Sequence, residues 1–215
     1  MRTIAKYSAV AAAAVAVLAA TAAPAAAETT GTYALLDQGH VDVFGLAYED
    51  GALDLHVHDE ESATEYAPNE VLLKADNEAK TKLAAGYEFL GAAGSTAWIL
   101  PDTEVDGLLF AGYGAEEIAA GDLVGDTVEF TVLDVEGRGG VALYQVDDFG
   151  TPNVLFDSDE GAGSWDVAAG DHGHLNWGFT KSGLYKFTVE AEGVDAATGQ
   201  TVSTGAVDYW FWVEA

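Results

Sequence analysis

The chain has 215 residues, of which 36 are acidic and 8 are basic, and it contains no cysteine. Its formal net charge of −28 repels phosphate backbones and anionic lipid headgroups, which argues against binding to nucleic acid or to a charged membrane surface. The lack of cysteine excludes disulfides, thiolate nucleophiles, cysteine-type zinc sites and iron–sulfur clusters. Any metal ion must therefore be held by His, Asp or Glu.

Residues 1–27 have the pattern of a secretory signal peptide. Arg2 and Lys6 precede an apolar run over residues 9–23, and Ala25 to Ala27 form a small-residue cleavage site. An N-terminal membrane anchor is the weaker alternative, because the apolar run is short and rich in alanine. We expect a secreted protein whose mature form, residues 28–215, is even more acidic and does not insert into a membrane.

From residue 30 onward, the sequence predicts strands joined by turns. Apolar residues alternate with polar or small ones, which is the period-two pattern of half-buried strands, in the segments 41–43, 53–57, 71–73, 128–132, 141–143, 184–189 and 209–213. Clusters of Gly and Asp separate these segments. Only residues 77–84 and 115–119 suggest short helical pieces.

These elements predict an all-β fold, a single immunoglobulin-like β-sandwich with short helical turns over residues 28–215. The aromatic segment from Tyr209 to Trp212 is interpreted as a core strand, and an aromatic sugar-binding platform is the alternative.

Histidine is rare and unusually placed. Four of the five histidines form two His-x-His pairs, and the fifth precedes Val41: they are His56 and His58, His172 and His174, and His40. On a strand, residues two positions apart share a face, so each pair presents two imidazoles side by side. In all three segments the histidines fall on the polar face, opposite apolar residues.

Neutral imidazoles with an optional carboxylate suit a borderline-soft divalent cation. We therefore predict a metal site drawn from all five histidines, with His56, His172 and His174 as the first choices, then His40, and His58 last. Zinc is the first expectation, with copper and manganese as alternatives. The carboxylates nearby in the sequence are Asp42, Asp54, Asp59 and Asp171. Structural histidines on a solvated face and a pH-sensing cluster remain open as alternatives.

One segment carries a family resemblance. Residues 170–180 read Gly-Asp-His-Gly-His-Leu-Asn-Trp-Gly-Phe-Thr and are followed by Ser182-Gly-Leu-Tyr185. This resembles the His-x-His-x-Asn-Trp-x-Phe-Thr, x-Gly-x-Tyr motif of the actinobacterial choice-of-anchor M family, also called the actinobacterial surface-anchored protein domain. The resemblance covers nearly all of residues 35–213, including 36–43, 53–59, 67–71, 89–95 and 98–101.

The resemblance implies an exported actinobacterial protein, anchored at the cell surface in many members and often encoded beside ABC transporters of the metal-uptake type. The family's histidine positions fall on the same five histidines. The chain lacks the C-terminal anchor of longer members, so we expect a released or loosely surface-associated form.

Other motifs are weak. Residues 157–161 open like a calcium loop but lack the distal bidentate acid, so an acidic turn is the better interpretation. We find no nucleophile elbow and no phosphate-binding loop.

The predicted function is thus extracellular metal capture or delivery, without catalysis, with a cell-surface ABC transporter or an anchored receptor as partner. The alternatives are a non-catalytic adhesion-like module and a metallohydrolase with three histidines and an open position for water. The acidic surroundings should raise the proton affinity of the imidazoles, so metal binding should weaken below about pH 6.5.

Overall fold

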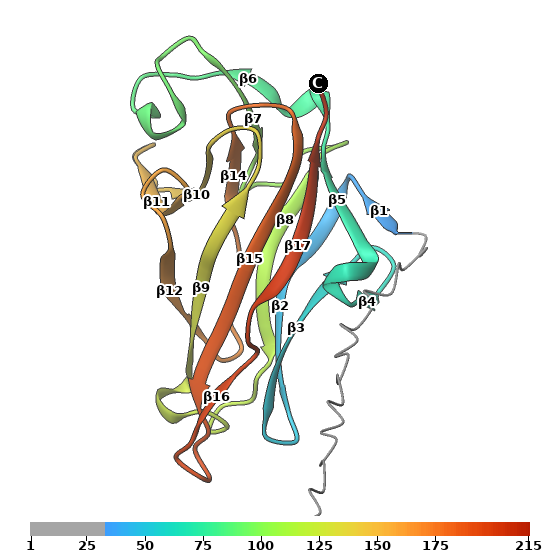
Figure 1. The fold of residues 1–215 in the computed structure, drawn as a ribbon, viewed down its shortest axis with the longest axis vertical. Coiled ribbons are helices and arrows are strands. Elements are labelled where there is room, and N and C mark those ends of the chain that lie inside the picture. The colour runs from blue at the N-terminus through green and yellow to red at the C-terminus, as the bar shows by residue number, and fades with distance from the viewer. Residues whose placement is uncertain (1–32) are drawn as a thin grey trace, which may run out of the picture. The chain divides into compact units, whose positions relative to one another are not determined.

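The computed structural model describes residues 33–215, so the expected signal peptide lies outside the described residues. Strands dominate this part of the chain, and its helical segments are 3-10 turns of three residues each (Figure 1). The predicted all-β class is therefore confirmed. Among the described residues, no helix is long and apolar enough to cross a membrane.

The largest sheet has seven strands. In spatial order they are β1 (Ala34–Leu36), β5 (Val71–Ala75), β17 (Val207–Val213), β15 (Gly183–Val194), β9 (Thr127–Glu136) and β12 (Gly163–Ala168), with β16 (Thr201–Ser203) beside β15. The pairs β1–β5 and β5–β17 are parallel, and the other pairs are antiparallel.

Two further sheets have five strands each. One contains β11 (Pro152–Asp157), β10 (Val141–Val146), β14 (Asn176–Phe179), β7 (Thr96–Leu100) and β6 (Lys80–Lys82). The other, which we call the histidine sheet, contains β13 (His172–His174), β8 (Leu109–Glu117), β2 (Gly39–Glu49), β3 (Ala52–Asp59) and β4 (Thr64–Tyr66). The 3-10 turns are η1 (Pro68–Glu70), η2 (Asn77–Ala79), η3 (Glu88–Leu90) and η4 (Val124–Asp126).

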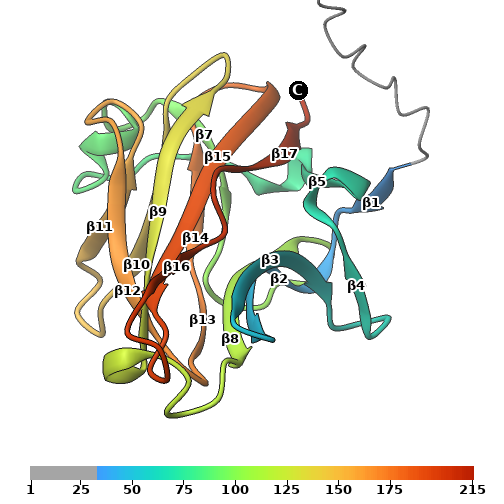
Figure 2. The same cartoon turned by 60° about the horizontal axis from the view of Figure 1, so that its bottom comes forward.

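One hydrophobic core joins the three sheets in a sandwich-like arrangement. Phe44 of β2 lies 4.5 Å from Phe130 of β9, 5.3 Å from Tyr209 of β17 and 5.2 Å from Trp177 of β14, between ring centroids. All four rings are buried. Figure 2 shows the histidine-sheet strands β2, β3 and β8 lying together, well away from β10 and β11. The aromatic core thus holds the histidine sheet against the rest of the fold.

The predicted strands are confirmed, because every segment with period-two alternation falls in a strand. Tyr209 and Phe211 are buried, as expected for a core strand, whereas Trp212 is 42% exposed. The helix expected over 77–84 is reduced to η2, followed by β6. The helix expected over 115–119 is wrong: Ala115 to Glu117 end β8, where pairing with β2 overrides the helical preference of alanine and glutamate.

A β-bulge in β2 sets the direction of the polar side chains. The pairing of β2 with β3 shifts between Asp42 and Gly45, and both Val43 and Phe44 are fully buried. The extra residue lets two neighbouring side chains enter the core and changes the phase of the strand. As a result, Gly45 lies opposite His56, and both line the same surface hollow as Asp42.

Candidate metal centre

Three neighbouring strands of the histidine sheet bring the candidate ligands together. Across β2, β8 and β13, Asp42 is aligned with Gly112, which is aligned with His174. Strands next but one are about 10 Å apart, so side chains on β2 and β13 can meet only by reaching over β8. Glycine at positions 112 and 114 of β8 leaves the space in which they meet.

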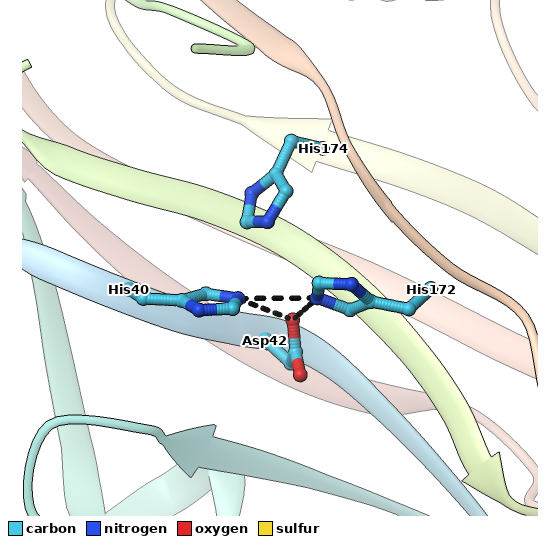
Figure 3. Close-up of side chains that lie close together, drawn as sticks. All are labelled: His40, Asp42, His172 and His174. Atoms are coloured by element: carbon cyan, nitrogen blue, oxygen red, sulfur yellow. Dashed lines mark hydrogen bonds and ion pairs between the residues drawn. The ribbon is translucent and has the colours of Figure 1, made fainter. Parts of the chain in front are cut away.

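Three ligand atoms converge above β8 (Figure 3). The Nε2 atoms of His40 and His172 are 3.1 Å apart, and His172 Nε2 is 3.0 Å from Asp42 Oδ1. The third side, from His40 Nε2 to Asp42 Oδ1, is 3.6 Å. Ligand atoms around a tetrahedral zinc ion with bonds of about 2.0–2.2 Å are separated by about 3.3–3.6 Å. The triangle therefore has close to the size of one face of a zinc tetrahedron.

The two nitrogens and the carboxylate oxygen of this triangle bring their lone pairs close together. With neutral rings, at most one of the two Nε2 atoms can donate a hydrogen bond to the other, and a carboxylate oxygen only accepts. The side chain of Asp42 is only 3% exposed, and among residues 33–215 no Lys or Arg forms an ion pair with it. A cation among these atoms would neutralise the buried carboxylate and use the lone pairs.

His174 lies above the triangle, with its ring directed toward His40 and His172 (Figure 3). One of its ring nitrogens lies within 4.8 Å of the ligand atoms of the other three residues. Its ring stacks on Phe110, with centroids 3.4 Å apart and an interplanar angle of 8°. The four residues thus form one group, which we call the three-histidine site.

The imidazole of His174 is held neutral. Burial, followed by the nearby His40 and His172, lowers its pKa to about 4. The Ala111 carbonyl counteracts this shift in part, but neither ring nitrogen is at hydrogen-bond geometry to any described residue. An unpaired buried nitrogen is costly, and a neutral imidazole is the form that binds metals. His174 thus presents a neutral imidazole of the kind that could hold a metal ion.

This finding corrects one expectation. The acidic surroundings were expected to raise the proton affinity of the imidazoles, but for His174 burial outweighs them and the pKa falls. Desolvation acts at short range on the buried ring, whereas the many carboxylates of this chain are mostly screened by water.

The other two histidines lie across β2 from the three-histidine site. His58 Nδ1 is 3.3 Å from Glu60 Oε1, and these two residues form a group with Asp42. His56 Nε2 is 3.8 Å from Glu117 Oε1 and belongs to a third group with Glu65. The structure therefore distributes the five predicted histidines over three adjacent groups rather than one.

Of the carboxylates noted in the sequence, only Asp42 joins the three-histidine site. Asp59 instead accepts hydrogen bonds from the backbone N–H of Glu61 and the hydroxyl of Ser62. Asp54 is exposed on β3.

Of the residues that support the site, Asn176 and Trp177 belong to the motif noted in the sequence, whereas the glycines of β8 were not singled out. A Cβ atom at Gly112 would lie 2.8 Å from His174 Nδ1 and 2.6 Å from the Gly173 carbonyl. The Trp177 indole N–H donates to the Ala111 carbonyl, which fixes β8 below the site. Asn176 bonds to the backbone at Asp102 and Tyr144. The recurrence of glycine at every second position, 112 and 114, was the only sequence signal that could have found these residues.

Neither a family model, nor a curated protein, nor a solved structure matches the chain.

Proposed function

We propose that this protein is a secreted, immunoglobulin-like β-sandwich protein that binds a transition metal ion outside the cell. The ligands are His40, Asp42, His172 and His174. Zinc is the first candidate, because three imidazoles and one carboxylate suit its tetrahedral preference, and copper and manganese are the alternatives.

One observation carries this proposal. Two imidazole nitrogens and a buried carboxylate oxygen converge within 3.0–3.6 Å, beside a third imidazole that has no hydrogen-bond partner among the described residues. A hydrogen-bonded structural cluster would satisfy both nitrogens of His174. An unsatisfied imidazole with one nitrogen within 4.8 Å of the triangle of lone pairs instead favours cation binding over a purely structural role.

The ligand set favours binding over catalysis. Catalytic zinc sites keep a position open for water beside three protein ligands, whereas four protein ligands close the shell. Asp42 would occupy the position that a metallohydrolase leaves open. We therefore propose a non-enzymatic role.

Capture or delivery of the ion in connection with an ABC-type uptake system is supported by the signal-peptide pattern of residues 1–27 and by the family resemblance. The partner would be the transporter or an anchored receptor. In the alternative role, an adhesion-like module, the histidines would only tie strands together.

Isothermal titration calorimetry tests the metal proposal. The purified chain, treated with a chelator and dialysed, is titrated with Zn²⁺, Cu²⁺ and Mn²⁺ and compared with the double variant His172→Ala, His174→Ala. We expect the variant to lose at least about 100-fold in affinity for the preferred ion, since two of four ligands are removed.

The matched control is Asp148→Asn, which removes an exposed acid in the turn between β10 and β11 and should bind like the wild type. If the wild type and the double variant bind all three ions equally poorly, the metal proposal is wrong and the adhesion-like role is favoured.

A further inference from the structure

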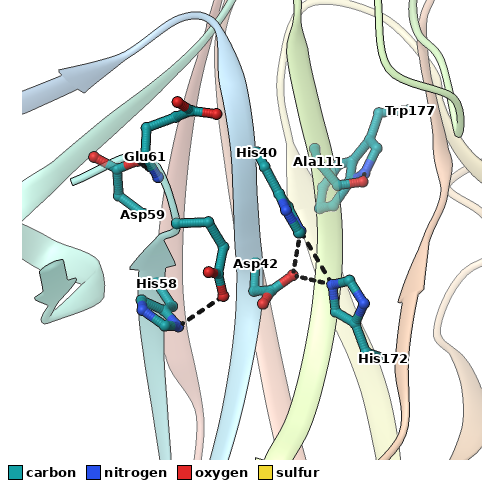
Figure 4. A network of polar contacts seen from close by, with 9 residues as sticks. His40, Asp42, His58, Asp59, Glu61, Ala111, His172 and Trp177 are labelled. Atoms are coloured by element: carbon teal, nitrogen blue, oxygen red, sulfur yellow. Dashed lines mark hydrogen bonds and ion pairs between the residues drawn. The ribbon is translucent and has the colours of Figure 1, made fainter. Parts of the chain in front are cut away.

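The carboxylate of Asp42 faces two groups of candidate ligands. Figure 4 shows Asp42 between His40 and His172 on one side and His58 on the other. Asp42 Oδ1 contacts His172, whereas Oδ2 lies beside Gly114, where a Cβ atom would be 3.0 Å away. Its two oxygens are therefore available in different places.

The second group lies across the β2–β3 pair. Asp42 is aligned with His58 in the register of these strands, so both side chains leave the same face of the sheet. Asp42, His58 and Glu60 each offer one ligand atom, and these atoms lie within 4.8 Å of one another. One imidazole and two carboxylates form a ligand set for a divalent cation.

A hollow lies next to this group and gives a cation room. Its volume is about 190 Å³, and it is lined by Asp42, His56, His58 and the acidic residues Glu60, Glu116 and Glu117. No Lys or Arg is among its lining residues, which all belong to the described part of the chain. Four carboxylates around one small hollow repel one another, and a bound cation relieves that repulsion.

Glycines keep the hollow open. A Cβ atom at Gly114 would lie 2.5 Å from Glu116 Oε2, and one at Gly45 would collide with the His56 ring. Both glycines have ordinary backbone angles, because neither has a positive φ. Space for polar side chains, rather than a turn, is therefore what requires glycine at these two positions.

We propose that a second divalent cation binds in this hollow, held by His58 and Glu60, with Asp42 as the carboxylate that bridges it to the ion of the three-histidine site. This inference rests on the proposed function, because it takes the three-histidine site as the first site. The second site is richer in oxygen, so it accepts manganese as well as zinc, whereas copper prefers the imidazoles of the first site.

The test is the number of ions bound per chain. The full chain is titrated with Zn²⁺ and with Mn²⁺ by calorimetry, and the bound metal is counted by mass spectrometry under non-denaturing conditions. We expect two Zn²⁺ ions for the wild type and one for the variant His58→Asn, Glu60→Gln, which keeps the tighter site. The variant His172→Ala, His174→Ala should also keep one ion, and Asp42→Asn should weaken both sites by about tenfold or more.

The outcomes separate the two proposals. A wild type that binds one ion, with the same affinity as His58→Asn, Glu60→Gln, overturns the second site and leaves the proposed function standing. A wild type that binds no ion overturns both. Asp148→Asn serves as the charge control and should bind two ions, and circular dichroism of each metal-free variant shows that the fold is retained.

Discussion

At the scale of single residues, His174 links the site to stability. Its pKa is lowered to about 4 by burial in the folded protein, whereas an imidazole in an unfolded chain has a pKa of about 6.5. Below pH 6.5 the His174 imidazole therefore binds a proton in the unfolded state but stays unprotonated in the folded state. The stabilisation associated with this residue is fully present above pH 6.5 and is lost progressively as the pH falls to about 4.

We expect His174→Gln to make the metal-free protein less sensitive to acid. Glutamine does not titrate, so the variant lacks the uptake of one proton on unfolding, which is at most about 1.4 kcal/mol per pH unit. Urea denaturation in the presence of a chelator, at intervals from pH 7 to pH 4 as approximate limits, gives the free energy of unfolding for both proteins. Curves that stay parallel over this range would show that His174 is not held neutral.

The sequence was sufficient to find the histidines but not to group them. The rule that residues two apart share a strand face placed all five on polar faces, and the structure agrees in bringing His172 and His174 to one side. The sequence could not show that His40 lies beside His172 and His174 while His56 does not, because that depends on which strands are neighbours in the sheet. Nor could it distinguish Asp42 from the other carboxylates, whose surroundings are set by tertiary packing.

At the scale of elements, β8 lies between the strands that carry the ligands and has no side chains at positions 112 and 114, where the ligands cross it. Phe110 supports the His174 ring from below, while Gly112 and Gly114 leave the space above the strand free. Glycine in a strand costs stability because it packs nothing. Its presence at two alternate positions of β8 is therefore explained by the side chains that cross over it.

We expect Gly112→Ala to weaken metal binding without removing a ligand. The new methyl group would approach His174 Nδ1 and the Gly173 carbonyl at 2.8 and 2.6 Å, so β13 or the His174 ring must move. A displaced ligand should cost about 10- to 100-fold in affinity. Calorimetry with Zn²⁺ measures this change.

Gly140→Ala is the matched control, because a Cβ atom there meets nothing closer than 3.6 Å. It should leave the affinity within about twofold of the wild type, since ordinary contacts require no movement. Equal affinities for the two variants would show that the close approach of β13 to β8 is not needed for the site.

Strands could be predicted from the sequence where one face of the strand is buried and the other is exposed to solvent, as in β3, β9 and β17. β8 was missed because its sequence, with small residues at 111, 112, 114 and 115, lacks the usual alternation of apolar and polar residues. The bulge in β2 could not be predicted from the sequence either, because a bulge depends on how the strand pairs with its neighbours, which the local residue pattern does not show. Both features belong to the histidine sheet, so the part of the fold that builds the site was the least predictable.

At the scale of the whole molecule, the histidine sheet depends on the common aromatic core for its position. Phe44 lies within the bulge of β2 and contacts rings from the other two sheets. The same bulge keeps Asp42 on the opposite, polar face. A single irregularity in one strand therefore fixes both the core contact and the ligand, and the site is as rigid as the packing behind it.

We expect Phe44→Ala to destabilise the protein by about 3–5 kcal/mol, because it leaves a large cavity where three sheets meet. The same substitution at Phe149, which is 93% exposed, is the control and should change the free energy of unfolding by less than about 0.5 kcal/mol. Urea denaturation of the metal-free proteins measures both values. If Phe44→Ala cost no more than Phe149→Ala, the histidine sheet would not be held by the aromatic core, and the rigidity of the metal site would need another origin.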